Sequence, residues 1–468
     1  MRPDLVVVGG GPAGMAAALT AAATGVSVAL VDSGARLGGQ IYRQPLRDDG
    51  GHGPVGAGLP ARFRALASAG VDLLAARAVW AVRRDGEEYE LSLATPEGAG
   101  AGTLRARALV LATGASELVL PFKGWDLPGV TTAGAAQALW KAEGLLIGRR
   151  VVVAGSGPFL LPVAAGLVRA GARVAAVVEA GDPRRHARAL AALTAAPHIV
   201  REALSYLGTL LAARVPLLTG AAVTAAEGSG CVEHVVVSRI DEAWRALPGT
   251  TRRFAADALC VSFGFVPRLE LARQLDLPDS TMPGRPGAAV VNHAGATRLG
   301  GVFVAGELTG IGGAHLAELE GRRAGAAAAA FLGRPARRAV VRDAALARAL
   351  AAARRLESLY PIGDGWLSWS DDGTVLCRCE DVPLAALHRA VAEGAARVRE
   401  VRGMTRCGMG YCQGRTCGPA LQLALAALTG RRTDEVGDLH LRPVASPVAL
   451  RAVADGGVGP AGATPTGS

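Results

Sequence analysis

Residues 5–14 read Leu-Val-Val-Val-Gly-Gly-Gly-Pro-Ala-Gly, and this stretch decides the fold of the N-terminal part of the chain. Its four apolar residues predict a buried parallel strand, and the alanine-rich run after it predicts a helix. The glycines are spaced G-x-G-x-x-G: Gly9 makes a tight turn, Gly11 lets a pyrophosphate approach the backbone, and Gly14 lets the helix pack on the strand. A second apolar strand ends at Asp32, whose carboxylate is placed to hydrogen-bond the adenosine ribose. The stretch therefore predicts a dinucleotide-binding βαβ unit.

A second stretch of this kind lies at residues 151–160, which read Val-Val-Val-Ala-Gly-Ser-Gly-Pro-Phe-Leu. It begins like the first, but Leu160 stands where the third glycine belongs. We expect this side chain to push the helix away from the strand and to crowd the pyrophosphate position. A later strand ends at Glu179, which keeps the βαβ pattern. We therefore expect a second nucleotide-binding fold that is kept as architecture, with NAD(P) binding doubtful.

Five of the seven cysteines lie in one short segment near the C-terminus. Cys377 and Cys379 form a C-x-C pair, and Cys412 and Cys417 form a C-x4-C pair in glycine-rich sequence. Four thiolates in two groups suit a 2Fe–2S cluster, because each iron takes two cysteine sulfurs. Zinc is less expected because structural zinc sites favour C-x2-C pairs, and free thiols in such a loop would be prone to oxidation. These four cysteines are the expected ligands, and Cys407, also in C-x4-C spacing with Cys412, is an alternative to one of them.

Composition and charge disfavour several classes of function. The net charge is +10, but 48 of the 50 basic residues are arginines spread along the chain, and only 4% of residues are aromatic, so nucleic-acid binding is not expected. No run of about twenty apolar residues is free of charge, which predicts no transmembrane segment. The N-terminus lacks the pattern of a signal peptide. Clustered cysteines suit a reducing compartment, so we expect a cytoplasmic protein, with contact to the inner face of the membrane only through partners.

Four further segments resemble motifs of flavoproteins that contain two dinucleotide-binding domains. They are the Gly-Gly-Gln-Ile-Tyr-Arg loop at 38–43, the Ala-Thr-Gly strand end within 109–115, the late flavin motif at 297–307 and the helix start at 310–321. The resemblance implies that the bound dinucleotide is FAD and that the helix N-terminus faces the flavin. Most relatives carry aspartate where this chain has Glu307, a longer substitute. The implied FAD-binding residues are Gly9, Gly11, Pro12, Ala13, Gly14, Asp32, Gly39, Gln40, Thr113, Gly114, Gly306, Glu307 and Ala314.

The cysteine segment resembles the bacterioferritin-associated-ferredoxin type of 2Fe–2S domain. The resemblance rests on Met-Gly-Tyr-Cys-Gln-Gly-Arg-Thr-Cys at 409–417. With the flavin motifs, nearly the whole chain resembles the FAD-containing α subunit of heteromeric amino-acid dehydrogenases. That group includes D-hydroxyproline dehydrogenase, opine oxidase, hydrogen cyanide synthase and related complexes that oxidise proline or sarcosine.

This resemblance implies a division of labour between subunits. A partner β subunit, itself a flavoprotein, would oxidise the C–N bond of an amino or imino acid such as D-hydroxyproline, an opine, proline, sarcosine or glycine. The present chain would hold FAD and the cluster, in some complexes beside a small ferredoxin-like subunit. It would pass electrons to a small-molecule acceptor or an electron-transfer chain. The sequence contains no clear pair of catalytic base and nucleophile, so no catalytic residue is assigned; His315 is more simply a polar residue of its helix.

Two other functions remain open. A self-contained NAD(P)H-dependent FAD oxidoreductase would use the second nucleotide-binding fold, against which Leu160 argues. A non-enzymatic iron-handling or assembly module would use the cysteine segment alone, against which the flavin motifs argue. No C-x-x-C pair occurs in the first 370 residues, which counts against a disulfide-reductase mechanism.

The predicted architecture is an α/β flavoprotein with two Rossmann-like dinucleotide-binding domains and a small C-terminal α-helical iron–sulfur domain. Its predicted parts are a discontinuous FAD domain (1–115 and 285–335), an NAD(P)-binding-like domain (116–284), a helical connection (336–372), the 2Fe–2S domain (373–432) and an extension (433–468) with a disordered tail from 455. We expect residues 183–220 to be helical, Cys231 and Cys260 to be core cysteines, and Trp366 and Trp369 to pack the iron–sulfur domain onto the flavin body.

Overall fold

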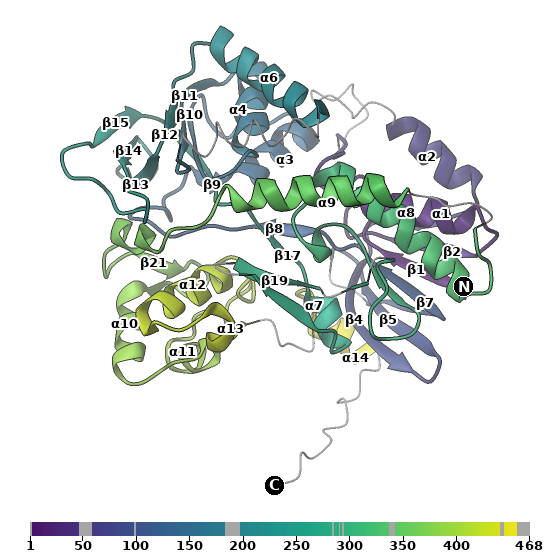
Figure 1. Ribbon diagram of the computed structural model, residues 1–468. Helices are drawn as coiled ribbons and strands as arrows, with labels where there is room; N and C mark the ends of the chain where they lie inside the picture. Colours follow the sequence, from purple (N-terminus) through teal and green to yellow (C-terminus); the bar gives the residue numbers. More distant parts are fainter. Residues whose placement is uncertain are drawn as a thin grey trace.

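The computed structural model describes most of the chain (Figure 1). The described residues are 2–45, 59–97, 100–182, 197–282, 285–289, 291–292, 294–336, 342–439 and 444–455. The predicted disordered tail falls outside the described residues except for its start at 455, and so does the first part, 183–196, of the predicted helical stretch.

The first nucleotide-binding fold is built on a parallel five-stranded sheet with strand order β20-β7-β1-β2-β3. Its strands are β1 (Leu5–Val8), β2 (Val28–Val31), β3 (Asp72–Leu74), β7 (Ala108–Leu111) and β20 (Val302–Val304). All four residues of β1 are buried, with Leu5 and Val7 in one core and Val6 and Val8 in the other. The predicted buried parallel strand is thus confirmed, since both faces of this sheet are covered.

Helices cover one face of this sheet and strands cover the other. The covering elements are α1 (Pro12–Ala22), α8 (Gly313–Phe331), β4 (Ala78–Asp85), β5 (Glu88–Ala94) and β6 (Gly100–Ala106), and α2 (Leu59–Ser68) packs beside α1. Helix α8 lies directly on α1, because a Cβ at Gly321 would stand only 2.1 Å from the carbonyl oxygen of Ala13. This contact brings a late segment of the chain onto the N-terminal fingerprint.

The chain leaves the first fold through β8 (Ala115–Glu117) and returns through β17 (Phe265–Pro267), which pair antiparallel. Between them lies a second parallel sheet, of order β12-β11-β10-β16-β9. Its strands are β9 (Val130–Thr132), β10 (Arg150–Gly155), β11 (Arg173–Glu179), β12 (Leu217–Thr219) and β16 (Ala258–Ser262). Its helices are α3 (Ala133–Glu143), α4 (Leu160–Arg169) and α6 (Pro197–Ala212), and it carries the antiparallel strands β13 (Ala221–Glu227), β14 (His234–Arg239) and β15 (Arg252–Ala255).

Two expectations for this region were wrong. The predicted helical stretch does not continue to residue 220, because 217–219 pair with β11 as a strand at the sheet edge. Cys260 is buried in β16 as predicted, but Cys231 is exposed. Cys231 lies in a tight turn, where a Cβ at Gly228 would stand 1.8 Å from the Cys231 carbonyl oxygen, and the turn leaves its side chain in solvent.

The C-terminal part is a small helical domain that follows the long helix α9 (Asp343–Ser358), as Figure 1 shows. Its elements are η3 (Asp364–Trp369), β21 (Val375–Cys377), β22 (Val382–Pro383), α10 (Leu384–Ala392), α11 (Val398–Thr405), α12 (Cys417–Thr429) and α13 (Thr433–Val436). The remaining elements are α7 (Glu270–Gln274), β18 (Asp279–Met282), β19 (Arg285–Ala289), η2 (Gly306–Thr309) and α14 (Leu450–Asp455). No helix among the described residues is long and apolar enough to cross a membrane.

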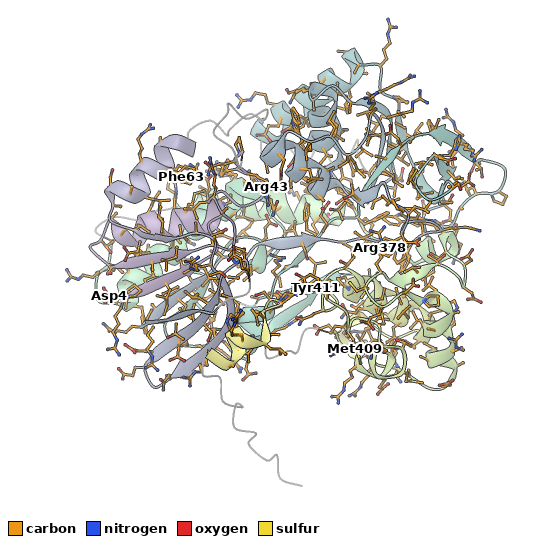
Figure 2. The ribbon with its side chains drawn as sticks, turned by 180° about the vertical axis from the view of Figure 1, so that it is seen from behind. Asp4, Arg43, Phe63, Arg378, Met409 and Tyr411 are labelled. Carbon is orange, nitrogen blue, oxygen red and sulfur yellow. The ribbon has the colours of Figure 1, made fainter. Side chains whose placement is uncertain are left out.

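The helical domain packs against the second nucleotide-binding fold. Trp369 stacks on Trp244 with ring centroids 5.9 Å apart, and its indole N–H donates to the carbonyl of Trp244. The guanidinium of Arg378 lies 4.1 Å from the ring centroid of Trp125, at the edge of the domain that Figure 2 marks with Arg378. The expectation that Trp366 and Trp369 pack onto the flavin body is therefore wrong, because both lie in a core shared with the second fold.

Candidate cofactor sites

The first fingerprint turn has the geometry of a pyrophosphate cradle. Gly9 has φ 109°, and a Cβ there would stand 2.2 Å from the Ala112 carbonyl oxygen. A Cβ at Gly14 would stand 1.7 Å from the carbonyl oxygen of Gly9, so only glycine permits this packing of helix and strand. A Cβ at Gly11 would make only an ordinary contact, 3.9 Å from the Cα of Gly39, and no side chain caps α1. The free N–H groups beside this turn suit a dinucleotide pyrophosphate.

Two acidic residues flank this cradle and are held by backbone N–H groups. Asp32 accepts from Gly10 at 2.5 Å and from Gly34 at 2.6 Å. Glu307 accepts from Gly312 at 3.2 Å and from Gly313 at 2.9 Å, at the N-terminus of α8. Burial raises the pKa of the Glu307 carboxyl. The extra methylene of Glu307 thus still leaves its carboxylate at the start of the helix that was expected to face the flavin.

Glu320 is a further buried acid of this site whose role the sequence did not reveal. Its carboxylate accepts from the Gly306 N–H at 2.9 Å and from the Thr309 hydroxyl at 2.9 Å, so it fixes η2. Burial raises the pKa of Glu320 to about 7. Glu320 lies two turns into α8, near the end of the 310–321 segment, and only the α8–η2 packing brings it back to Gly306.

The remaining predicted FAD residues lie around the same turn. Gly39 packs on Gly11, and a Cβ at Gly306 would stand 2.9 Å from the Cβ of Ala13. The loop that contains Gln40 is held at Tyr42, whose hydroxyl donates to Glu318 at 2.8 Å. Three other predicted members make hydrogen bonds within the protein: Thr113 donates to the Arg268 carbonyl at 2.8 Å, Gly114 accepts from the Arg268 N–H, and Gln40 accepts from Arg43 at 3.0 Å. The last two lie in helices: Pro12 begins α1, and Ala314 is half-buried in the first turn of α8.

The second fingerprint turn keeps only part of this geometry. A Cβ at Gly155 would stand 1.8 Å from the Ser262 carbonyl oxygen, so this glycine has the same function as Gly9. Leu160, however, is 2% exposed, and α4 begins only at this residue. Helix α4 therefore begins two residues later in its turn than α1 does, and a buried leucine stands where the first turn has Gly14.

The acid of the second fold is also covered. Glu179 accepts from Gly157 at 2.9 Å and from Gly181 at 2.8 Å, and burial raises its pKa to about 7. Tyr360, which follows α9, lies close enough that burial and the Glu179 carboxylate both raise the pKa of its phenol. The second fold thus keeps its acid buried and hydrogen-bonded to its own backbone.

Five cysteines converge in the C-terminal domain. The sulfurs of Cys377, Cys407 and Cys417 lie within 4.8 Å of one another. Cys379 and Cys412 are hydrogen-bonded to each other through their side chains. Gly410 permits this approach, because a Cβ there would stand 2.3 Å from the Cβ of Cys379.

Backbone N–H groups point at three of these sulfurs. Gly408 and Glu380 donate to Cys377. Cys412 donates to Cys379 and itself receives the N–H groups of Thr416 and Gly414. An all-sulfur donor set surrounded by such donors suits an iron–sulfur cluster, whose sulfurs carry negative charge.

Arginine links the cluster loop to the flavin-domain connection. Arg415 donates to the Cys412 carbonyl at 3.2 Å, lies 3.2 Å from a carboxylate oxygen of Glu270, and also bonds the Ala445 carbonyl. Glu270 begins α7 shortly after β17. The loop that carries Cys412 is therefore anchored to the segment that returns from the second fold to the first.

Comparisons with known proteins agree with this geometry. The family model "Pyridine nucleotide-disulphide oxidoreductase" matches residues 3–329, and the "BFD-like [2Fe-2S] binding domain" matches residues 375–427. An opine oxidase subunit of Agrobacterium tumefaciens (strain Ach5) is 34% identical, over 96% of this chain and 91% of that protein. The HcnB subunit of hydrogen cyanide synthase from Pseudomonas aeruginosa is 35% identical, over 97% of this chain and 98% of that protein.

Solved structures show the same fold. The crystal structure of L-proline dehydrogenase from P. horikoshii has a TM-score of 0.67 and 19% identity, and the match covers 96% of this chain and 78% of that one. Thioredoxin reductase of T. acidophilum has a TM-score of 0.52 and 21% identity, with coverage of 70% and 98%.

These findings confirm the predicted fold class and the two cofactors. A pyridine nucleotide-disulphide oxidoreductase body implies FAD, and the BFD-like domain with its cysteine cluster supports 2Fe–2S. The chain therefore belongs to the family of these opine oxidase and hydrogen cyanide synthase subunits, FAD-dependent oxidoreductases with a C-terminal BFD-like [2Fe-2S] domain.

Proposed function

We propose that this chain is the electron-transfer subunit of a heteromeric amino-acid dehydrogenase. The observation that carries the proposal is the contrast within the chain: one intact dinucleotide cradle and one cysteine cluster, but a second nucleotide turn in which Leu160 replaces the packing glycine. The relatives named as subunits of opine oxidase and hydrogen cyanide synthase support a complex. The substrate class would be an amino or imino acid.

The partner would be a flavoprotein β subunit that oxidises the substrate, joined in some complexes of this kind by a small ferredoxin-like subunit. When bound, FAD supplies two-electron chemistry and a 2Fe–2S cluster supplies one-electron steps, so the pair can pass electrons singly to an outside acceptor. The reduced cysteine cluster favours a cytoplasmic location.

The residues of the chain have distinct tasks in this proposal. The Gly9–Gly14 turn would hold the pyrophosphate, and Asp32 would hold the ribose while Gly10 and Gly34 fix its carboxylate. The Glu307 carboxylate would lie beside the flavin-facing end of α8. Cys377, Cys379, Cys412 and Cys417 are the proposed cluster ligands. Arg415 would keep the cluster loop at a fixed place relative to β17, by its bonds to Cys412 and Glu270.

An anaerobic titration of the purified chain tests this function. We expect flavin absorption bands, about two irons per chain and a reduced-cluster EPR signal after dithionite. NADH should leave the flavin oxidised, since the second turn lacks its packing glycine and Glu179 is buried. Rapid bleaching by NADH would instead support a self-contained NAD(P)H-dependent reductase, and a chain that binds iron but no FAD would support the iron-handling module.

A further inference from the structure

The loop of residues 38–44, here called the FAD loop, forms one wall of the first cradle. A Cβ at Gly39 would stand 3.0 Å from the Cα of Gly11, so the loop lies directly on the fingerprint turn. Gly38 has φ 124°, and a Cβ there would stand 2.2 Å from the carbonyl oxygen of Tyr42. The loop therefore closes into a tight turn at Tyr42, and whatever holds this tyrosine also fixes the wall.

Three side chains from three different elements meet at this tyrosine. The Tyr42 hydroxyl donates to a carboxylate oxygen of Glu318 in α8 at 2.8 Å, and Arg62 in α2 donates to the same oxygen at 2.5 Å. The guanidinium of Arg62 also lies 5.2 Å from the ring centroid of Tyr42. The Glu318 side chain is only 14% exposed, so these charge-assisted bonds are largely shielded from water. We call this arrangement the Tyr42–Glu318–Arg62 latch.

Helix α8 holds the cradle on two sides through two acids. Glu318 binds Tyr42 of the FAD loop, and Glu320, two residues later, accepts from the Gly306 N–H at 2.9 Å. Gly306 in turn lies against the cradle, because a Cβ there would stand 2.9 Å from the Cβ of Ala13. Both neighbours of the fingerprint turn are thus tied to one helix, which itself packs on α1.

We propose that the Tyr42–Glu318–Arg62 latch positions the FAD loop over the bound dinucleotide and so slows the release of FAD. The inference rests on the proposed function, in which the first turn holds FAD. A loop that is already ordered in its bound position loses less conformational entropy on binding, so the affinity is higher. The three residues are positioning residues, since they act through the loop that contains Gln40.

Three variants of the full-length chain test this inference. Glu318→Ala removes both bonds of the latch and should raise the Kd of FAD about 10- to 100-fold. Tyr42→Phe removes only the hydroxyl and should raise it about 3- to 10-fold. Combined with Glu318→Ala, Tyr42→Phe should add nothing further, because both changes break the same contact. Flavin fluorescence of the deflavinated chain titrated with FAD gives the Kd, and fluorescence recovery on dilution gives the release rate.

Two matched controls break similar bonds of the same fold outside the latch. Tyr89→Phe removes a buried hydroxyl that donates to the Gly300 carbonyl at 2.6 Å. Gly300 precedes β20, so this bond lies at the edge of the parallel sheet opposite to the cradle. Glu90→Ala removes a buried carboxylate that binds Arg83 and Arg105, each at 2.6 Å. Both controls should lower the free energy of unfolding but leave the Kd of FAD at the native value.

The outcomes separate this inference from the proposed function. If the native chain binds no FAD, the proposed function fails and this inference with it. If the native chain binds FAD but Tyr42→Phe and Glu318→Ala bind it equally well, the inference alone is overturned. Additive effects of the two changes, or an equal loss of affinity in Tyr89→Phe and Glu90→Ala, would also overturn it.

A fourth variant keeps the test decisive if Glu318→Ala does not fold. Arg62→Met removes the ion pair but keeps an apolar side chain beside the Tyr42 ring. Its Kd for FAD should then rise as in Tyr42→Phe, with an unchanged iron content as evidence that the rest of the chain is intact. Native FAD affinity in both Arg62→Met and Tyr42→Phe would contradict the inference.

Discussion

The two nucleotide-binding turns of this chain begin alike and end differently. In both turns the first glycine lies against a carbonyl oxygen at the end of a neighbouring strand. A Cβ at Gly9 would stand 2.2 Å from the Ala112 carbonyl oxygen, and a Cβ at Gly155 would stand 1.8 Å from the Ser262 carbonyl oxygen. At the third position, Gly14 lets α1 lie on the turn, whereas Leu160 is the buried first residue of α4. Helix α1 begins at Pro12, but α4 begins two residues later than the corresponding Pro158.

This comparison shows which part of the motif maintains the fold and which part makes the ligand site. The first glycine is needed for the strand to turn, so it remains where no dinucleotide is expected. The third glycine is needed for the helix N-terminus to reach the phosphates, so it can be replaced by a core residue once that contact is not used. The second fold is then free to serve as a support for the iron–sulfur domain, whose tryptophans pack on it.

The largest effect is expected from Gly14→Ala, which makes the first turn resemble the second. Its Cβ would stand 1.7 Å from the Gly9 carbonyl oxygen, so α1 must move away from β1. We expect loss of bound FAD and a decrease of about 1–3 kcal/mol in the free energy of unfolding. The ratio of flavin to protein absorbance and urea denaturation measure the two effects.

The control for this variant is Gly166→Ala in α4, where a Cβ meets nothing within 4 Å. It should keep its full flavin content and equal or exceed the native stability, since alanine favours a helix. A Gly14→Ala chain with a full complement of FAD would show that the packing glycine is not required here, and the contrast between the two turns would lose its basis.

The next largest effect is expected from Leu160→Ala. Because Leu160 is 2% exposed and part of the α4 core, its truncation should cost about 2–5 kcal/mol of unfolding free energy. FAD content should not change, since the first fold is untouched. Leu161→Ala, at a half-buried neighbour, should cost clearly less. Equal losses from both variants would mean that Leu160 has no special place in the core.

The buried acid of the second turn predicts a pH effect. The pKa of Glu179 is about 7 in the folded chain against an ordinary value of 4.5. As the pH rises, the unfolded chain releases this proton first, so Glu179 lowers the stability of the folded state between about pH 4.5 and pH 7. In Glu179→Gln this decrease, on the order of 3 kcal/mol, should be missing from the pH profile of the unfolding free energy.

Because Glu320 also has a raised pKa, the difference between native and Glu179→Gln profiles is the quantity to compare. Glu320 contributes equally to both and cancels. The exposed Glu202→Gln serves as the control and should leave the profile unchanged. A difference profile that is flat from pH 4.5 to pH 7 would contradict the burial of an ionisable Glu179.

Local patterns predicted the turns and the convergence of the cysteines because each depends on residues close in sequence. The G-x-G-x-x-G spacing was enough to place Gly9, Gly11 and Gly14 in the first turn, and it showed that the second turn lacks the packing glycine, but it did not predict that α4 begins only at Leu160. The two pairs Cys377–Cys379 and Cys412–Cys417 likewise predicted a common site. The sequence could not decide whether Cys407 is one of the cluster ligands, because the spacing of the cysteines does not reveal which backbone N–H groups or helix ends lie beside each sulfur.

Contacts between elements that are distant in the sequence could not be predicted from it. Glu320 reaches Gly306 only because α8 packs against η2. Trp369 was expected to face the flavin body but stacks on Trp244, since an apolar ring gives no sign of which core it will join. Cys231 was placed in the core for its apolar character, and the turn that exposes it depends on Gly228.

Leu160→Gly, which restores the complete glycine pattern, should destabilise the chain at least as much as Leu160→Ala, but the smallest effect of all is expected on the reaction with NADH. NADH should still not bleach the flavin, because the missing glycine is only one of three differences between the turns. Phe159 packs edge-on against Phe265, with ring centroids 5.0 Å apart, and so holds the start of α4 independently of Leu160. Glu179 is still buried and held by two backbone N–H groups, whereas Asp32 is half-buried. Flavin bleaching in Leu160→Gly is measured by anaerobic titration with NADH, and the FAD content serves as the control for an intact first turn. Saturable bleaching of the flavin by NADH in Leu160→Gly would show that the Leu160 side chain alone prevents NADH binding at the second site. It would also show that the buried position of Glu179 does not prevent this binding.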